Sequence, residues 1–321
     1  MLRVLFFLII ALPAPPAAAQ ELFVNGGVMQ NSLMNETEGQ WSVTYRQGLN
    51  RHLAFGFTYI NEAHRTSNYR DGLSAQLWGQ TTVGDFPLSV ALGIGPYAFF
   101  DTRFSPGTDI YHNAHDFGIL SSATATWQGM SPWLLQLRID YITNNNTYDT
   151  LSATAGIGYL LEAPASPGSP PLPAGRIGAT DNEIALYLGA GVINNNGADQ
   201  SLAGGIEYRR SLAAYLQWTI AILDEGDTRT LGRYGIATQL WAVRSFLDSR
   251  LELGIGAGPY LARDKNGDGD GKPATTVAGD VSVTAAYRFQ PRLSLRATWS
   301  RIITDYSRDT DLFLGGLAYR F

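Results

Sequence analysis

The sequence predicts an all-β fold with a transmembrane antiparallel β-barrel architecture, and three observations lead to this prediction. Only 16% of the 321 residues are charged, whereas soluble globular domains average about 25%. The chain contains 35 glycines, and its aromatic content is 12%, which is typical of membrane barrels with aromatic girdles. Short segments alternate apolar and polar residues, the pattern of a β-strand with two different faces.

The charge balance and the absence of cysteine exclude several classes of function. The chain has 23 Lys and Arg residues against 28 Asp and Glu residues, a net charge of -5. This acidic balance indicates no nucleic-acid partner, because proteins that bind nucleic acids present a basic face. The sequence has no cysteine, so disulfides, thiolate catalysis and cysteine-ligated metals are excluded.

Residues 1–19 are predicted to be a secretory signal peptide. Arg3 gives a positive start, residues 4–12 form a short apolar run, and residues 17–19 are three alanines that suit cleavage. The apolar run is too short to cross a bilayer core of about 30 Å. No later segment reaches about 18 continuous apolar residues, so we expect no transmembrane helix. The mature chain is therefore expected to be exported.

The segment 132–141 shows the strand alternation clearly. Every second residue is apolar or aromatic, namely Trp133, Leu135, Leu137, Ile139 and Tyr141. The opposite face carries polar or ionisable residues, namely Gln136, Arg138 and Asp140. Segments 51–60 and 292–300 alternate in the same way. A face that mixes small and ionisable residues suits a polar barrel lumen better than a soluble surface rich in Lys and Glu.

Applied along the chain, the same pattern predicts sixteen strands, eight in each half. In the first half they lie near 22–29, 40–46, 51–60, 71–80, 86–98, 115–127, 132–143 and 150–161. In the second half they lie near 184–193, 201–208, 212–223, 232–243, 249–262, 277–288, 292–303 and 310–321.

The connections between these strands alternate between long and short. The long, polar ones are 30–39, 61–70, 99–114 and 144–149, and the tight ones are 47–50, 81–85 and 128–131. Outer-membrane barrels have long extracellular loops and short periplasmic turns. A periplasmic N-terminus therefore places every long loop outside the cell.

The two halves of the chain form a tandem duplication. The triplet at 76–78 recurs at 239–241, and the Gly-x-Gly-Pro-Tyr motif at 93–97 recurs at 256–260, both at an offset of 163. The pair Asp149-Thr150 recurs as Asp309-Thr310. The sequence thus predicts a signal peptide at 1–19, a first eight-stranded repeat at 20–162, a Pro-rich periplasmic linker at 163–182 and a second repeat at 183–321.

The end of the chain resembles the C-terminal signature of bacterial outer-membrane β-barrel proteins. Phe321 is last, and Tyr319, Leu317, Gly315 and Phe313 occupy the alternating positions before it. In that family the barrel-assembly machinery reads the last strand, and the proteins lie in the outer membrane of Gram-negative bacteria. The resemblance implies that location here, with outer-membrane lipid, lipopolysaccharide and the assembly machinery as partners.

Each repeat is about as long as the small eight-stranded barrels of the OmpA and OmpX type. The two repeats resemble these barrels. The sequence therefore favours two tandem eight-stranded barrels, because the Pro-rich linker is longer than a tight periplasmic turn. A single sixteen-stranded, porin-like barrel is the alternative architecture. The corresponding functions are a structural, surface-exposed or binding role through extracellular loops, or a porin or channel for small solutes.

Strand parity places a repeated set of polar and aromatic side chains inside the barrels. The set is Glu62, Arg70, Gln76, Trp78 and Tyr97 in the first repeat, and Glu225, Arg233, Gln239, Trp241 and Tyr260 in the second. Buried charges need partners and hydrogen bonds. A polar network that fills the lumen and holds the barrel closed is the expected role, with a gate, a small-ligand site or a catalytic site as alternatives.

A lipid A-modifying outer-membrane enzyme is a further alternative. Glu62, His64 and Ser67 resemble the residue set of outer-membrane lipid A deacylases. Those enzymes carry the His and Ser close together on a late strand, whereas the late strands 132–143 and 292–303 contain no His. No catalytic residue is therefore assigned.

The segment 264–271 resembles the first half of a calcium-binding loop. The candidate ligands are Asp264, Asn266, Asp268 and Asp270, and Gly269 occupies the turn position. The full pattern requires Glu at the twelfth position, where this chain has Thr275. The sequence therefore predicts weak calcium binding or a flexible acidic loop.

Overall fold

The computed structural model describes residues 20–32, 37–64, 68–105, 110–144, 148–162, 182–195, 197–228, 231–267 and 272–321. The expected signal peptide and nearly all of the expected linker lie outside these residues. Both therefore stay predictions.

Sixteen strands account for most of the described residues. Those of the first half are β1 (Gln20–Asn31), β2 (Thr37–Gly48), β3 (Leu53–His64), β4 (Asn68–Thr82), β5 (Leu88–Phe104), β6 (Tyr111–Met130), β7 (Trp133–Thr143) and β8 (Thr150–Glu162). Those of the second half are β9 (Asn182–Ile193), β10 (Gln200–Ala213), β11 (Leu216–Asp227), β12 (Gly232–Phe246), β13 (Leu251–Asp264), β14 (Ala274–Arg288), β15 (Leu293–Ile303) and β16 (Thr310–Arg320).

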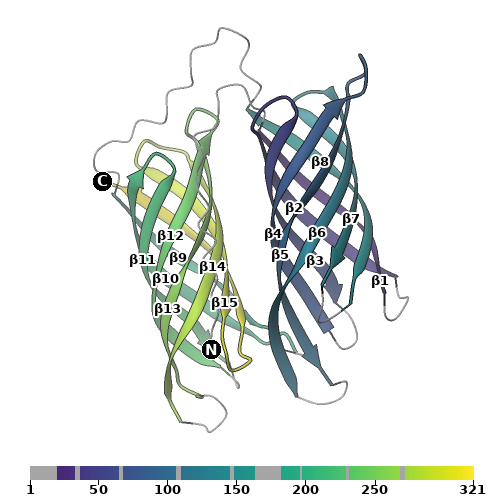
Figure 1. Ribbon diagram of the computed structural model, residues 1–321. Coiled ribbons are helices and arrows are strands. Elements are labelled where there is room, and N and C mark those ends of the chain that lie inside the picture. Colours follow the sequence, from purple (N-terminus) through teal and green to yellow (C-terminus); the bar gives the residue numbers. More distant parts are fainter. Residues whose placement is uncertain are drawn as a thin grey trace. The chain divides into compact units, whose positions relative to one another are not determined.

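Each half closes on itself as an eight-stranded antiparallel barrel (Figure 1). In barrel one, β1 to β8 pair in chain order, and β1 closes the sheet against β8. In barrel two, β16 closes the sheet against β9. The prediction of two tandem barrels is confirmed. The single sixteen-stranded barrel is wrong, because β1 and β9 already have their two neighbours within their own halves.

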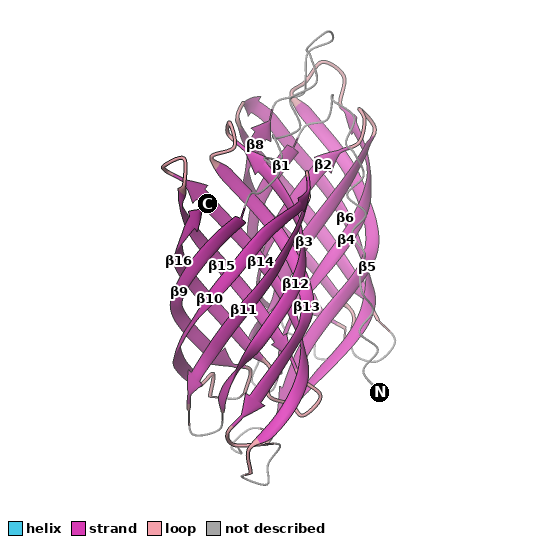
Figure 2. Cartoon of the chain, turned by 90° about the vertical axis from the view of Figure 1, so that its left-hand side faces the viewer, coloured by secondary structure: helices cyan, strands magenta, loops and turns pink. Residues whose placement is uncertain are grey.

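The strands run obliquely across the barrel walls, as closure of a sheet requires (Figure 2). The described part of the chain contains no helix, and hence none long and apolar enough to cross a membrane. We call the end that includes the two-residue connections 131–132 and 214–215 the turn end. Its connections are 49–52, 83–87 and 131–132 in barrel one, and 214–215, 247–250 and 289–292 in barrel two. The other end is the loop end.

Three expected long loops are shorter than the sequence predicts, because the flanking strands continue into them. The strands β5 and β6 remain paired from Phe99 opposite Asp116 to Phe104 opposite Tyr111, inside the expected loop 99–114. The aromatic rings in this extension pack across strands, with the centroid of Phe104 4.9 Å from that of Tyr69. The expected loops 30–39 and 61–70 reduce to 32–36 and 65–67 for the same reason. The strand expected at 212–223 lies at 216–227, after a tight turn.

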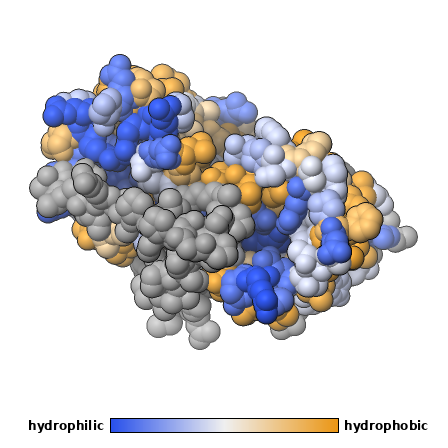
Figure 3. Space-filling model, turned by 90° about the horizontal axis from the view of Figure 1, so that it is seen from above, coloured by the Kyte–Doolittle hydropathy of each residue, from blue (hydrophilic) through white to orange (hydrophobic). Residues whose placement is uncertain are grey.

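The two faces of the wall have opposite character. On β7, the outward Trp133, Leu137 and Ile139 are more than half exposed, whereas the inward Arg138 and Asp140 are 2% and 1% exposed. Viewed from the turn end, hydrophilic side chains gather on the end faces, and apolar side chains lie on the flanks (Figure 3). A soluble strand buries its apolar face, so this inverted arrangement is the pattern of a barrel surrounded by lipid.

Because each sheet closes without an edge strand, each half is expected to fold alone. We predict that 20–162 and 183–321, expressed separately, both refold in detergent micelles. The measurement is electrophoretic mobility of unheated against boiled samples, together with the β-signal in circular dichroism. A half that folds only in the presence of the other half would contradict independent closure.

Candidate functional site in the barrel lumens

The Glu62 carboxylate in barrel one accepts hydrogen bonds from three neighbouring side chains. Arg70 donates from Nε to Oε1 at 2.8 Å and from Nη2 to Oε2 at 2.5 Å. The Tyr97 hydroxyl donates to Oε1 at 2.7 Å, and the Thr150 hydroxyl donates to Oε2 at 2.9 Å. Both charged side chains are 0% exposed. The bidentate, charge-assisted geometry is the strong form of an ion pair.

This cluster ties together strands that are remote in the sequence. Glu62 comes from β3, Arg70 from β4, Tyr97 from β5 and Thr150 from β8. Arg70 also donates from Nη1 to the carbonyl of Tyr148 at 3.1 Å, and its guanidinium lies 4.0 Å from the Tyr148 ring centroid. The contacts therefore cross the lumen near the loop end and hold opposite walls at a fixed distance.

Barrel two repeats the arrangement with the equivalent residues. Arg233 donates from Nε to Glu225 Oε1 at 2.5 Å and from Nη2 to Oε2 at 2.7 Å. The Thr310 hydroxyl donates to Glu225 Oε2 at 2.5 Å. Arg233 Nη1 donates to the Tyr306 hydroxyl at 3.0 Å and to the Arg308 carbonyl at 3.1 Å. Tyr260 is also fully buried at the position equivalent to Tyr97.

A second polar layer in barrel one contains Gln76 and an arginine–aspartate pair. Gln76 donates to the Ser122 hydroxyl at 2.9 Å, and Ser122 donates to Asp140 at 2.5 Å. Arg138 donates from Nε to both oxygens of Asp140 at 2.8 Å, and from Nη1 to Thr44 at 2.7 Å. Each charge in this layer is thus paired.

The second layer of barrel two lacks such a pair. Gln239 donates to Ser282 at 2.9 Å, and Ser282 donates to Asp280 at 2.8 Å. Ser300 stands where barrel one has Asp140, and its hydroxyl lies 2.7 Å from that of Ser282. Asp280 is 2% exposed, and no Arg or Lys among the described residues forms a salt bridge with it. Barrel two therefore holds a carboxyl group that is desolvated without a cationic partner.

The two tryptophans fill equivalent positions against glycines. A Cβ on Gly93 would lie 2.5 Å from the Trp78 ring, and one on Gly256 would lie 2.4 Å from the Trp241 ring. Trp241 donates from Nε1 to Thr219 at 2.9 Å. Gly56 occupies the position in barrel one that Thr219 has in barrel two. The Trp78 Nε1 atom has no hydrogen-bond partner among the described residues.

Arginine–glutamate pairs near the turn end complete the filling of each lumen. In barrel one, Arg46 lies 2.5 Å from Glu21, and its guanidinium lies 5.7 Å from the Trp78 ring centroid. In barrel two, Arg296 contacts Glu183 at 2.7 Å and Glu252 at 3.1 Å. Arg209 pairs with Glu207 at 2.9 Å and lies 4.3 Å from the Trp241 ring centroid.

Sequence reasoning missed several members of these networks, although a signal was present for some. Thr150 and Thr310 belong to the Asp-Thr pair that recurs in both halves, yet the repeat alone did not assign them a contact. Arg138 and Asp140 stand on the polar face of an alternating strand. The turn-end pairs join residues far apart in the sequence, such as Glu183 and Arg296 at 113 residues, and carry no local signal.

The other candidate residues are placed only in part. Asp264 accepts hydrogen bonds from Arg308 at 3.1 Å and from Tyr306 at 3.3 Å. Lys265 donates to both oxygens of Asp227 at 2.8 and 2.9 Å, which raises the pKa of Lys265 above its usual value. Asp268 and Asp270 lie outside the described residues, as does Ser67, and the His64 side chain is not described. Calcium binding and catalysis therefore stay predictions.

The chain is similar to known proteins in structure but not in sequence. No protein-family model and no curated protein sequence matches the chain. Similar solved structures include the N-terminal β-barrel domain of Pseudomonas aeruginosa OprF, at 9% identity and a TM-score of 0.35, covering 43% of this chain and 96% of that one. Neisserial surface protein A is 15% identical with a TM-score of 0.36, covering 44% of this chain and 96% of that one. The Yersinia pestis attachment invasion locus protein Ail is 9% identical with a TM-score of 0.35, covering 45% of this chain and 97% of that one.

Breaking the Glu62–Arg70 pair is expected to destabilise barrel one strongly. The variant Arg70→Met leaves the buried Glu62 carboxylate without its cation, which costs about 3–5 kcal/mol. The double variant Glu62→Leu/Arg70→Met removes both charges and is expected to recover most of that loss. The measurement is urea unfolding in lipid vesicles. Equal losses for the single and double variants would contradict the pairing.

Asp140 and Asp280 offer a comparison between a paired and an unpaired buried carboxylate. Asp140→Asn leaves Arg138 uncompensated and is expected to lower the unfolding free energy by about 3–5 kcal/mol. Asp280→Asn removes a desolvated charge that has no cation to balance it, so stability is expected to stay level or rise. The same urea experiment compares the two variants, and a large loss for Asp280→Asn would show a partner that the structure does not assign.

Proposed function

We propose that the protein is an outer-membrane barrel protein of a Gram-negative bacterium, with a structural and binding role carried by its extracellular loops. One observation carries the proposal: both lumens are filled by buried, hydrogen-bonded charged side chains, whereas the outer walls are apolar. An eight-stranded barrel has just enough interior for its own side chains. The barrels are therefore proposed to act as non-conducting membrane anchors.

The difference between the two ends supports an orientation in the membrane. The connections at the turn end span two to five residues, and those at the loop end span three to nine and are longer on average (Figure 1). Because outer-membrane barrels place short turns in the periplasm, the loop end is proposed to face the exterior. The extended β5–β6 hairpin then reaches outward from barrel one. The loops are proposed to meet the partners of the protein.

The partners proposed for the walls follow from their chemistry. The outward side chains Phe313 and Leu317 of β16 are apolar and more than half exposed, as is Phe321 directly after the strand. Such a strand suits recognition by the barrel-assembly machinery before closure, and contact with lipid and lipopolysaccharide after it. The Glu62 carboxylate accepts hydrogen bonds from Arg70, Tyr97 and Thr150, which supports a structural role for it in the lumen.

The decisive experiment is single-channel recording of the refolded mature protein in planar bilayers. We expect no stable open-channel steps, because the charged networks occupy both lumens. Folding is verified first by the mobility shift between unheated and boiled samples, so that an absence of current cannot be due to unfolded protein. The control is Trp78→Ala, which removes the ring that packs against Gly93 in barrel one and is expected to produce small transient currents. Large, stable steps from the wild-type protein would overturn the proposal.

A further inference from the structure

The turn end of barrel two carries a ring of arginines. The set comprises Arg210, Arg244, Arg250, Arg288, Arg292 and Arg320. They come from β10, β12, β14 and β16 and from the turns 247–250 and 289–292, so they lie around the barrel rather than on one side of it. Arg210, Arg250 and Arg292 are exposed, whereas the other three are partly buried. Arg320 also lies 3.8 Å from the buried Glu183. Asp248 is the one exposed acidic residue of this rim in the described part of barrel two.

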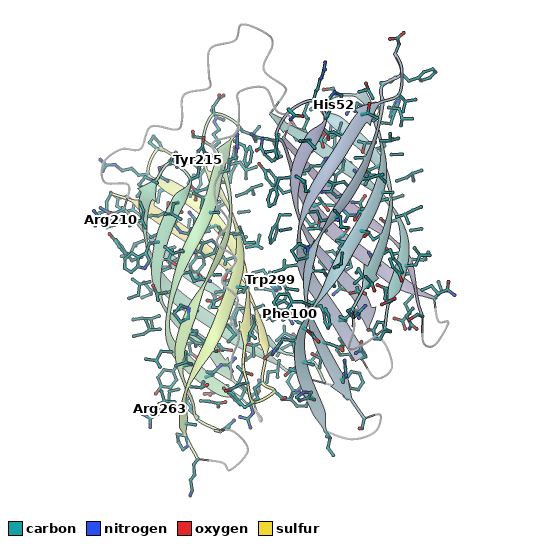
Figure 4. All side chains as sticks on the ribbon, viewed as in Figure 1. His52, Phe100, Arg210, Tyr215, Arg263 and Trp299 are labelled. Carbon is teal, nitrogen blue, oxygen red and sulfur yellow. The ribbon has the colours of Figure 1, made fainter. Side chains whose placement is uncertain are left out.

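This concentration of positive charge is specific to one end of one barrel. At the loop end of barrel two, Arg263, Lys265 and Lys272 are exposed beside the acidic Asp224 and Asp227. At the turn end of barrel one, Arg51 and His52 are exposed together with Asp85. Figure 4 labels Arg210 and Tyr215 at the turn end of barrel two and Arg263 at its opposite end. The net acidity of the chain makes the ring more unusual.

Aromatic side chains accompany the arginines of the ring. The Arg244 guanidinium lies 5.8 Å from the Tyr215 ring centroid. Arg292 donates from Nη1 to the Tyr319 hydroxyl at 3.4 Å. Arg210 stands opposite Trp218 in the pairing of β10 with β11. Tyrosine and tryptophan mark the boundary between hydrocarbon and headgroups in barrel walls, so the arginines stand at headgroup depth.

We infer that the arginine ring of barrel two binds anionic phospholipid headgroups of the leaflet at the turn end. The inference rests on the proposed function, because it needs barrel two to span a membrane. A ring around the whole barrel suits lipid, which surrounds a barrel, better than a protein partner, which covers one side. The guanidinium group has planar, bidentate geometry that matches a phosphate. A basic residue at an anionic surface contributes about 1 kcal/mol.

The test compares the stability of the refolded protein in two kinds of vesicle. One contains phosphatidylcholine alone, and the other contains about one third phosphatidylglycerol, an anionic lipid. Urea unfolding is followed by electrophoretic mobility at low salt and again in about 0.5 M salt, which screens exposed charges. We expect the anionic vesicles to raise the folding equilibrium constant about five-fold for each arginine in contact, and high salt to remove most of this gain.

Two triple variants with the same change in net charge test whether the gain in stability from anionic lipid comes from the arginine ring. Arg210→Gln/Arg250→Gln/Arg292→Gln neutralises the three most exposed arginines of the ring. Arg51→Gln/Arg263→Gln/Lys272→Gln removes the same charge elsewhere. We expect the first variant to lose about a hundred-fold of the gain from anionic lipid, and the second to retain most of it. All substituted side chains are exposed, so both variants are expected to fold.

The outcomes separate this inference from the proposed function. If the wild-type protein inserts and folds in both vesicles with equal stability, the arginine ring has no preference for anionic lipid and the inference falls alone. Equal losses in the two variants would assign the effect to net charge and would also overturn it. If the protein inserts into neither kind of vesicle, the proposed function falls and takes the inference with it.

Discussion

A charge inside a closed barrel must be paired or hydrogen-bonded by side chains of the same barrel, and this requirement governs both lumens. Water cannot solvate Glu62 or Arg70, since both side chains are 0% exposed, so each supplies the counter-charge of the other. The geometry is demanding, because the partners come from different strands and the pair must also satisfy Tyr97 and Thr150. These contacts form only when the strand order, the closure of the sheet and the positions of the small residues bring the partner side chains together.

The duplication shows which parts of this network tolerate change. The ion pair near the loop end and the threonine that supports its carboxylate recur in the two barrels, whereas the Tyr260 hydroxyl has no hydrogen-bond partner among the described residues. The middle layer has diverged, since barrel one keeps the Arg138–Asp140 pair and barrel two has Asp280 with hydroxyl partners alone. Trp78 and Trp241 also differ in their partners. A filled interior is therefore common to both barrels, whereas the means of filling it is not.

The two barrels also differ in the surfaces they present. Barrel one extends a paired hairpin beyond its wall at the loop end, and barrel two carries the arginine ring at its turn end. Each feature lies at one end of its own barrel. The two barrels of the chain thus differ at their ends, while the strands of both walls keep the same alternation of apolar and polar residues. Such a division suits a protein whose barrels are anchors and whose ends make the contacts.

The sequence by itself determined the strands, their inward and outward faces and the duplication, because the side-chain period of two is a local property of the backbone. Parity placed Glu62 and Arg70 inside, and the recurrence at an offset of 163 marked them with Glu225 and Arg233 as a related set. Closure at eight strands was decided only by the tertiary structure, since β1 pairs with β8 through contacts between distant residues. The same holds for the membership of each network: contacts across a lumen join strands far apart in the chain, and local pattern does not encode which of them meet.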